Sequence, residues 1–126
     1  MVVSLVKIHQ MKLNNKPFNM IKNGRKNIEL RLYDEKRRKL NIGDEIIFRN
    51  LKDGETISVT ILALHKYESF AELYKHFDKA SIGYEDNEFA NPEDMNEYYT
   101  PEKQKQYGVV GIGSKTESYK YKSEII

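Results

Sequence analysis

The chain has 126 residues, of which 39% are hydrophobic and 32% are charged, and its formal net charge is +2. These values are typical of a globular protein and exclude an extensively disordered chain, while so small a net charge predicts neither a nucleic-acid nor a membrane partner. The chain has no cysteine, which excludes disulfide bonds, thiolate catalysis and cysteine-ligated metal sites.

Neither a metal site nor a membrane segment is expected. The three histidines, His9, His65 and His76, are far apart in the chain and form no ligand spacing. No apolar run reaches the length of a membrane-spanning helix, and the N-terminus lacks the pattern of a signal peptide. We therefore predict a cytoplasmic protein with no cofactor, folded as a single domain over residues 1–126. The sequence does not specify an oligomeric state.

The first half of the chain predicts mainly strands. A strand is expected over residues 2–13, followed by a helix over 14–24 in which Asn15 is the cap, Pro17 lies in the first turn and Gly24 ends the helix in a left-handed conformation. Three more strands are expected, over 27–33, 45–50 and 56–67, and an Asp-Gly pair marks a hairpin between the last two.

The strand expected over 27–33 has one apolar and one polar face. Ile28, Leu30 and Leu32 alternate with Asn27, Glu29, Arg31 and Tyr33. Because side chains alternate across a strand, Glu29 and Arg31 leave the same face. We expect the apolar face to cover a barrel core and the polar face to line a ligand cleft.

The second half of the chain predicts helices and a closing strand. Ser69 and Glu72 form a capping box that begins a helix over 69–79, and Thr100 and Pro101 begin another over 100–108. The acidic segment 80–99 between them predicts a long connection with a helical turn. A closing strand is expected over 107–115 and a flexible tail over 116–126. These elements predict an α+β fold, a small β-barrel with flanking helices, whose closure removes exposed sheet edges.

Cations are concentrated in one part of the sequence. Seven lie within eighteen residues: Lys22, Arg25, Lys26, Lys36, Arg37, Arg38 and Lys39. The acidic residues gather instead between Glu68 and Glu102, so the sequence predicts a basic face with an acidic flank.

The octapeptide GRKNIELR, Gly24 to Arg31, resembles the G-x-K-x-x-E-x-R signature of the ASCH domain, a branch of the PUA-like superfamily. The segments ESFAELYKHFDKASIGY and YTPEKQKQYGVVGIG are also similar to later parts of that family, and the resemblance covers roughly residues 5–115. It implies a PUA-like barrel in which the signature residues meet in a cleft, with RNA as the default ligand.

Each signature residue has a role in this interpretation. Lys26 contacts a phosphate or activates a nucleophile, and Glu29 accepts hydrogen bonds from a base or sugar. Arg31 donates paired hydrogen bonds from its guanidinium to a carboxylate, carbonyl or phosphate. Tyr33 stacks on a base, and the run at 36–39 contacts phosphates. The predicted ligand-binding residues are Gly24, Arg25, Lys26, Glu29, Arg31, Tyr33, Arg37 and Arg38.

Structural roles remain open alternatives for several of these residues. Glu29 and Arg31 form a simple salt bridge in one alternative, and Gly24 serves only to end the helix. Four tyrosines are candidates for the mouth of the cleft: Tyr84, Tyr98, Tyr99 and Tyr107. Of these, we single out Tyr107, which lies beside Gly108.

Three functions fit the sequence. The first is a domain that binds RNA or a nucleotide-like ligand in a basic cleft. The second is a small hydrolase with Lys26 and Glu29 as catalytic residues, because one bacterial branch of the family removes the acetyl group from N(4)-acetylcytidine and ribonuclease activity occurs in the wider family. That branch has a threonine nucleophile where this chain has Glu29, and Glu85, Asp86 and Glu88 are candidates for its second acid. The third is a protein-interaction barrel with a vestigial cleft.

Overall fold

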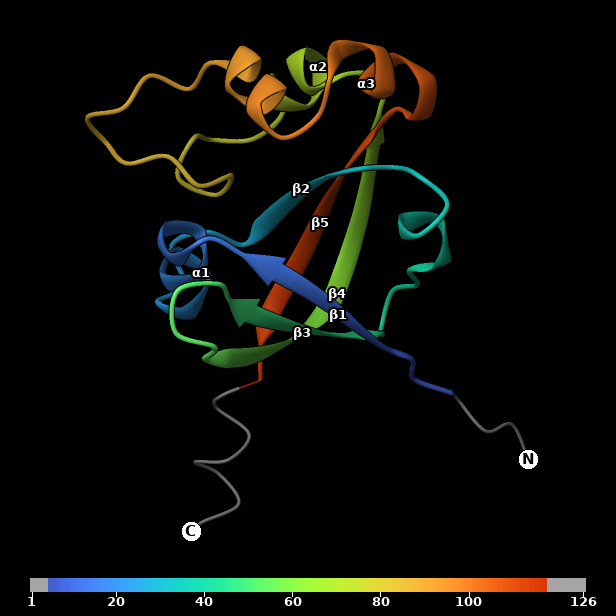
Figure 1. The fold of residues 1–126 in the computed structure, drawn as a ribbon, viewed down its shortest axis with the longest axis vertical. Helices are drawn as coiled ribbons and strands as arrows, with labels where there is room; N and C mark the ends of the chain where they lie inside the picture. The colour runs from blue at the N-terminus through green and yellow to red at the C-terminus, as the bar shows by residue number, and fades with distance from the viewer. Residues whose placement is uncertain (1–4, 118–126) are drawn as a thin grey trace, which may run out of the picture.

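Five strands form one strongly curled sheet in the order β1-β3-β4-β5-β2 (Figure 1). They are β1 (Ile8–Leu13), β2 (Ile28–Leu32), β3 (Glu45–Asn50), β4 (Thr56–Tyr67) and β5 (Val109–Thr116). The computed structural model describes residues 5–117. β1 and β3 run parallel and the other neighbours are antiparallel. The α+β class is therefore confirmed.

The sheet is a half-barrel, because β1 and β2 stand at its two edges and form no ladder with each other in the described chain. The expected closure is replaced by a side-chain contact, in which Arg31 Nη2 of β2 donates to the backbone oxygen of Lys12 in β1 at 2.9 Å. We call this junction of the two edge strands the seam.

The helices lie in two places. Helix α1 (Asn15–Lys22) follows β1 and packs beside the lower part of the sheet (Figure 1). Helix α2 (Phe70–Tyr74), the 3₁₀ helix η2 (Pro92–Glu97) and helix α3 (Pro101–Tyr107) form a helical layer over one end of the sheet (Figure 1). A second 3₁₀ helix, η1 (Arg37–Lys39), follows β2.

Two hydrophobic clusters hold these parts together, and β2 contributes to them in a way opposite to the expectation. Its apolar residues Ile28, Leu30 and Leu32 pack with α2 and η2 in the cluster beneath the helical layer. Its polar face lies on the same side of the sheet as the main core, since Arg31 is opposite Val110, a residue of that core. The main core consists of Met11, Leu13, Phe18, Ile21, Leu40, Ile46, Phe48, Val59, Ile61, Val110 and Ile112.

Element boundaries differ from the sequence prediction at several points. The first strand begins at Ile8 rather than at residue 2, and the cap of α1 is Asn14, not Asn15. Helix α2 ends at Tyr74 because i to i+3 hydrogen bonds tighten the chain there, which lets Phe77 pack edge-on against His65. The start of the expected tail, Thr116, still belongs to β5, and residues 118–126 lie outside the described range.

The caps of the later helices agree with the prediction. Ser69 Oγ accepts a hydrogen bond from the backbone N–H of Glu72, although the Glu72 carboxylate binds Lys75 instead of completing a capping box. Thr100 Oγ1 accepts one from the backbone N–H of Lys103. The helical turn expected within 80–99 is η2, with Asn91 as its cap.

Candidate functional site

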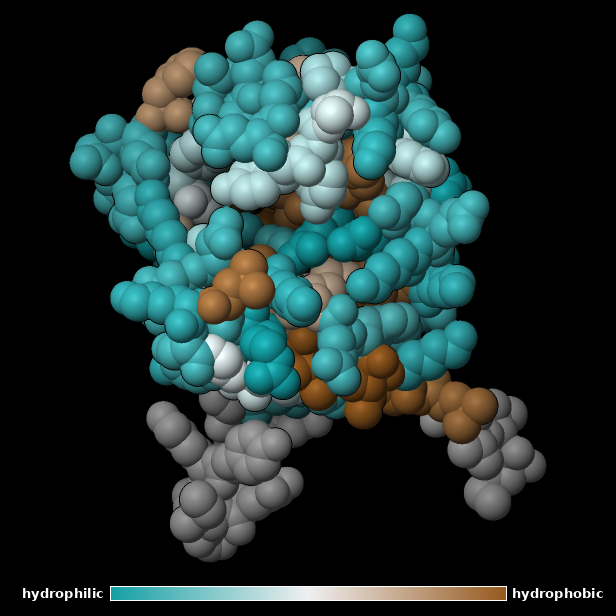
Figure 2. All heavy atoms as spheres, in the orientation of Figure 1, coloured by the Kyte–Doolittle hydropathy of each residue, from teal (hydrophilic) through white to brown (hydrophobic). Residues whose placement is uncertain are grey.

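A cleft of about 520 Å³ opens between the half-barrel and the helical layer. Figure 2 shows a hollow between these two parts, with hydrophilic surface on its floor. Three stretches line most of it: residues 12–17 where β1 passes into α1, residues 26–31 that lead into β2 and form most of it, and residues 82–99. The cleft thus lies along the seam, where the sheet fails to close.

The floor of the cleft carries a buried ionic network of three residues. Lys26 Nζ lies 2.7 Å from Glu29 Oε1, and both Arg31 Nε and Arg31 Nη2 lie 2.7 Å from Glu29 Oε2. Glu29 is only 4% exposed and Lys26 7%. One acid therefore neutralises one of two cations, and the network has a formal charge of +1.

The two cations keep Glu29 ionised. Burial alone would raise the pKa of this carboxyl, but the charges of Lys26 and Arg31 and the hydrogen bonds from both outweigh burial and lower the pKa to about 2. Both carboxylate oxygens are occupied by donors. Glu29 is therefore a fixed anion that orients Lys26 and Arg31, and it is a poor proton acceptor at neutral pH.

The position of Lys26 depends on two loops. Its backbone N–H donates to Met20 at the end of α1, and the carbonyl of Ser81 accepts from both Asn27 and Ile28. Gly83 then crosses the Lys26 side chain with φ of +108°, and a Cβ at Gly83 would lie 3.2 Å from Lys26 Cδ. Only glycine combines that backbone conformation with so close an approach.

The opposite wall of the cleft is built from tyrosines and acids of the segment 82–99. The Tyr84 hydroxyl lies 2.8 Å from the Tyr74 hydroxyl and donates to Asp94 Oδ2 at 2.8 Å. Burial, followed by these hydrogen bonds, raises the pKa of Tyr84, so its hydroxyl stays protonated. Tyr98 and Tyr99 also line the cleft, and Tyr99 stacks on Phe70 of α2 with ring centroids 6.1 Å apart.

The charge of the cleft is mixed, whereas the sequence had predicted a basic cleft. Its lining contains four cationic and four acidic side chains. The cations are Lys12, Lys16, Lys26 and Arg31, and the acids are Glu29, Glu88, Asp94 and Glu97. The cations lie on β1, α1, β2 and the connection that leads into β2, whereas Glu88, Asp94 and Glu97 lie on the opposite wall. The cleft is therefore polarised.

Five of the eight predicted ligand-binding residues lie outside the cleft lining. Arg25 forms an ion pair with Asp86 at 2.7 Å, Arg37 binds Asp34 at 2.9 Å, and Gly24 ends α1 with φ of +84°.

Tyr33 lies under two cations, with the Arg38 guanidinium carbon 4.4 Å and Lys66 Nζ 4.9 Å from its ring centroid. Tyr33 and Arg38 fall outside because β2 ends at Leu32 and the chain turns away toward η1. Lys26, Glu29 and Arg31 are the three that the fold brings together.

The other residues predicted for the site, four tyrosines and three acids, also lie partly inside and partly outside the cleft lining. Of the four tyrosines, Tyr84, Tyr98 and Tyr99 line the cleft, whereas Tyr107, the one singled out, lies in a separate shallow hollow between α3 and the end of β4. Of the three acids, Glu88 lines the cleft and pairs with Lys16, whereas Glu85 and Asp86 pair with Arg25. The sequence did not predict three other residues of the cleft lining, because none of them belongs to a recognisable motif. These are Lys12, Lys16 and Asp94.

Residues 5–117 contain neither a metal-binding cluster nor a membrane-spanning helix. No group of three or more His, Asp or Glu side chains within this range is placed to hold a metal ion. Over the same residues, no helix has the length and hydrophobicity that crossing a membrane requires.

The fold and the cleft together define a class, an α+β half-barrel of the PUA-like kind. A family model of the ASCH domain matches residues 11–117, and the chain belongs to the ASCH domain family. The hypothetical protein PH0355, known from a crystal structure, is 32% identical, with a TM-score of 0.73 over 86% of this chain and 98% of that chain. Protein PF0455 from Pyrococcus furiosus, known from a solution NMR structure, is 33% identical, with a TM-score of 0.67 over 89% of this chain and 99% of that one.

A more distant structure shares the fold alone. It is a serine-to-alanine mutant of ZmASCH from Zymomonas mobilis, 12% identical, with a TM-score of 0.63 over 86% of this chain and 68% of that chain. A comparison with curated protein sequences found no match.

Proposed function

We propose that this ASCH domain binds single-stranded RNA or a nucleotide-like ligand, with one nucleotide unit inside the cleft. The observation that carries the proposal is the buried network of Lys26, Glu29 and Arg31 on the floor of a cleft with tyrosine walls. The cleft volume of about 520 Å³ falls within the range of about 300–1,000 Å³ typical of small-ligand sites. A base that is already unstacked can enter such a space, whereas a paired base in a duplex cannot.

The side chains on the two walls suit the parts of a nucleotide. Arg31 presents a rigid guanidinium, held by Glu29, that can donate to a carbonyl or a phosphate. Tyr98 is 59% exposed, so its ring is available for stacking on a base. The Tyr84 hydroxyl and the Asp94 carboxylate offer hydrogen bonds on the opposite wall.

The alternative, a small hydrolase that uses Lys26 and Glu29, is less well supported by the geometry. Glu29 would have to act as a general base, yet its pKa is lowered to about 2 and both its oxygens accept hydrogen bonds from cations. Lys26 would have to act as, or activate, a nucleophile while bound to that anion at 2.7 Å. Neither group is free for chemistry until a ligand rearranges the network.

One paired assay tests both functions. Labelled single-stranded RNA and duplex RNA of the same sequence are titrated with protein at two salt concentrations, and turnover of N(4)-acetylcytidine and of the RNA is followed in parallel. We expect salt-sensitive binding of the single strand, weaker binding of the duplex and no turnover. Turnover of either substrate that is abolished by Lys26→Ala would make the hydrolase the correct function.

A variant on the surface of the cleft assigns the binding site without disturbing the core. Tyr98→Ala removes an exposed ring from the cleft, and without this ring to stack on a base, single-strand binding should weaken by about tenfold. Phe89→Ala is the matched control, because Phe89 is 82% exposed and does not line the cleft. Equal affinities of the two variants would contradict the placement of the base in this cleft.

A further inference from the structure

The cleft has a second pair of cations, Lys12 and Lys16, which the buried network does not use. Lys12 lies near the end of β1, Lys16 lies in the first turn of α1, and both line the cleft. Both side chains are exposed, unlike those of Lys26 and Arg31. The backbone beside them is well anchored, since the carbonyl of Lys12 accepts the hydrogen bond from Arg31 across the seam. This pair is called the rim lysines below.

The two rim lysines differ in whether they have an ion-pair partner. Lys16 Nζ lies 2.8 Å from Glu88 Oε1, an acid that comes from the opposite wall. Lys12 has no ion-pair partner within residues 5–117. The Lys16–Glu88 ion pair is partly exposed, with 55% and 36% of the two side chains accessible, so it contributes little to stability and can exchange for another anion.

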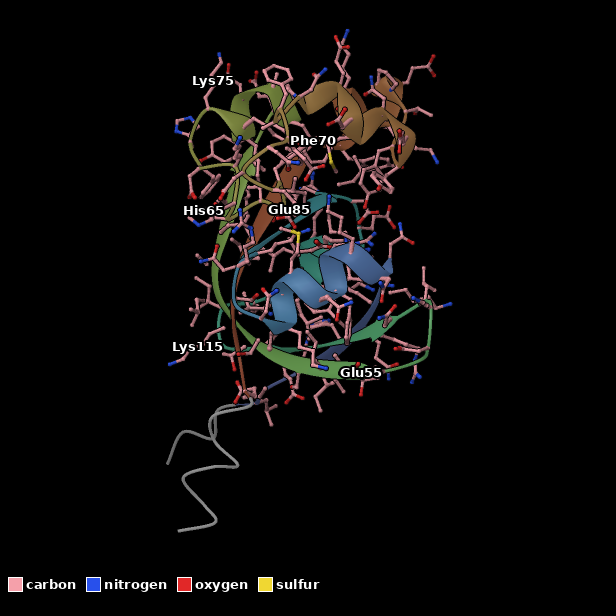
Figure 3. The ribbon with its side chains drawn as sticks, turned by 90° about the vertical axis from the view of Figure 1, so that its left-hand side faces the viewer. Glu55, His65, Phe70, Lys75, Glu85 and Lys115 are labelled. Carbon is pink, nitrogen blue, oxygen red and sulfur yellow. The ribbon has the colours of Figure 1, made fainter. Side chains whose placement is uncertain are left out.

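Glu88 is held in place independently of Lys16. The same carboxylate oxygen accepts a hydrogen bond from the backbone N–H of Glu85 at 2.7 Å, and Lys79 Nζ donates to the carbonyls of Asp86 and Glu88. Figure 3 shows Glu85 on the segment that faces α1. The segment 85–88 therefore presents a fixed carboxylate to α1, in the position where an anionic ligand would meet Lys16.

We propose that the rim lysines bind the phosphate of the nucleotide, and that Glu88 stays paired with Lys16 until the phosphate displaces the Glu88 carboxylate. This inference rests on the proposed function of the cleft and adds the chemical class of the ligand, a phosphorylated nucleotide unit in preference to a nucleoside. It also places the phosphate at residues 12–16 rather than at the cationic run 36–39.

Charge and burial favour the rim lysines over the buried network as the phosphate site. Lys26 and Arg31 share Glu29, so a phosphate on them would have to compete with a buried anion that both already contact. Within residues 5–117, Lys12 has no paired acid to displace, and Lys16 has only a partly exposed ion pair to exchange, so a phosphate meets weaker competition at these two flexible side chains. The first turn of α1 contains no acid and Asn14 makes no side-chain cap, so the helix end adds a partial positive charge of the same sign.

The polarity of the cleft fixes the direction of the ligand. Asp94 and Glu97 on the opposite wall repel a phosphate, while their oxygens can accept hydrogen bonds from a base or sugar. A nucleotide with its phosphate on the rim lysines therefore directs its base toward the acids of η2 and the tyrosines of the same wall.

The test compares three ligands by calorimetric titration at low salt: a ribonucleoside, its 5′-monophosphate and the corresponding dinucleoside monophosphate. We expect the parent protein to bind the monophosphate about tenfold or more tightly than the nucleoside, as one or two charge-assisted hydrogen bonds would give. In the double variant Lys12→Gln/Lys16→Gln this ratio should fall close to one, with the nucleoside affinity unchanged. An equal advantage for the dinucleoside monophosphate would identify a phosphodiester, and hence an RNA strand, as the source of the phosphate.

Glu88→Gln tests the competition directly. Glutamine can still accept the hydrogen bond from Glu85 but no longer neutralises Lys16, so the monophosphate should bind about threefold more tightly and the nucleoside as before. The matched controls are Lys75→Gln and Glu72→Gln, which break an exposed lysine–glutamate pair of the same 2.8 Å length in and just after α2. Figure 3 shows Lys75 at the far end of the helical layer from α1. Neither control should change the ratio.

The outcomes separate the two proposals. If the parent protein binds the nucleoside and the double variant keeps the full phosphate advantage, the phosphate site is wrong while the function of the cleft stands. If the parent protein binds none of the three ligands and no single-stranded RNA, the proposed function itself is wrong.

Discussion

Arg31 Nη2 donates to the backbone oxygen of Lys12 at 2.9 Å, and this hydrogen bond joins the two edge strands of the sheet. The same guanidinium binds Glu29 at 2.7 Å, so one side chain connects the seam to the buried network. A closed barrel would place a backbone ladder here and leave no cleft. Because a side chain replaces the ladder, the space between the edge strands remains open to a ligand.

We expect Arg31→Ala to lower the free energy of unfolding by about 2 kcal/mol, because it leaves a buried carboxylate with one partner fewer and frees the Lys12 carbonyl. Arg31→Lys should recover part of this stability, since lysine keeps the positive charge but cannot donate the several hydrogen bonds of the planar guanidinium. Urea unfolding monitored by circular dichroism measures both.

The control for the seam is Arg49→Ala. Arg49 also donates to a backbone oxygen, that of Gly54 at 3.2 Å, but it is exposed and has no buried acid beside it. Its removal should change stability by less than about 0.5 kcal/mol. Equal effects of the two alanine variants would show that the seam does not depend on Arg31.

Glu29 should make the protein sensitive to acid in a defined pH window. Its pKa is about 2 in the folded protein against an ordinary value of 4.5, so its stabilising effect is complete above pH 4.5 and is lost as the pH falls toward 2. The size of the effect is about 3 kcal/mol. Urea unfolding of the parent protein between pH 6 and pH 2 should show this decrease in stability.

The variant Glu29→Gln isolates the contribution. It should be less stable at neutral pH, because two buried cations no longer have their anion, and its stability should fall less steeply through the same window. Glu72→Gln alters an exposed acid. The hydrogen bond from Lys75 lowers the pKa of Glu72, but this exposed pair contributes little to stability, so the curve should stay close to that of the parent. A Glu29→Gln curve parallel to that of the parent would mean that another group titrates in this range.

Local patterns predicted part of the site, and long-range packing accounts for the rest. The alternation in 27–33 correctly placed Glu29 and Arg31 on one face, because strand geometry repeats every two residues. Which face meets the main core was predicted wrongly, because the burial of Ile28 and Leu30 depends on α2 and η2, which come later in the chain.

The wall of the cleft formed by residues 82–99 could not be predicted from the spacing of apolar and polar residues. The segment 82–99 is mostly irregular and is positioned by single hydrogen bonds, such as those from β2 to the neighbouring Ser81 carbonyl and from the Tyr84 hydroxyl to Asp94. The signal in the sequence was the density of tyrosines and acids in a long connection, which contains Tyr84, Tyr98 and Tyr99. Tyr107 was singled out for its place beside Gly108, and it lies outside the cleft.

Gly83→Ala should impair both stability and ligand binding. Its φ of +108° disfavours any side chain, which should cost about 1–2 kcal/mol of stability, and the new Cβ would lie 3.2 Å from Lys26 Cδ. Lys26 must then shift, and nucleotide affinity should fall with it. Gly54→Ala is the control, because it has φ of +79° and its nearest neighbour, Arg49 Nη1, would lie 3.8 Å away.

These two glycine variants separate backbone strain from crowding at Lys26. Both should be destabilised by a similar amount, and only Gly83→Ala should bind the nucleotide more weakly. Calorimetric titration at a temperature well below both melting transitions makes the comparison. Unchanged affinity in Gly83→Ala would indicate that the exact position of Lys26 does not matter to the ligand.

The cationic run 36–39 should affect only ligands that extend beyond the cleft. Arg37 is committed to Asp34, whereas Arg38 and Lys39 are exposed and lie outside the cleft lining. The variant Arg38→Gln/Lys39→Gln should therefore bind a mononucleotide as the parent does. It should bind a longer single-stranded RNA more weakly, with the slope of log K against log salt reduced by about 0.7 for each phosphate that the protein no longer neutralises. Lys75→Gln, which alters an exposed lysine outside the run, should leave that slope unchanged. If the double variant binds long RNA with the parent slope, the strand does not cross η1, and its path must leave the cleft on the side of α1.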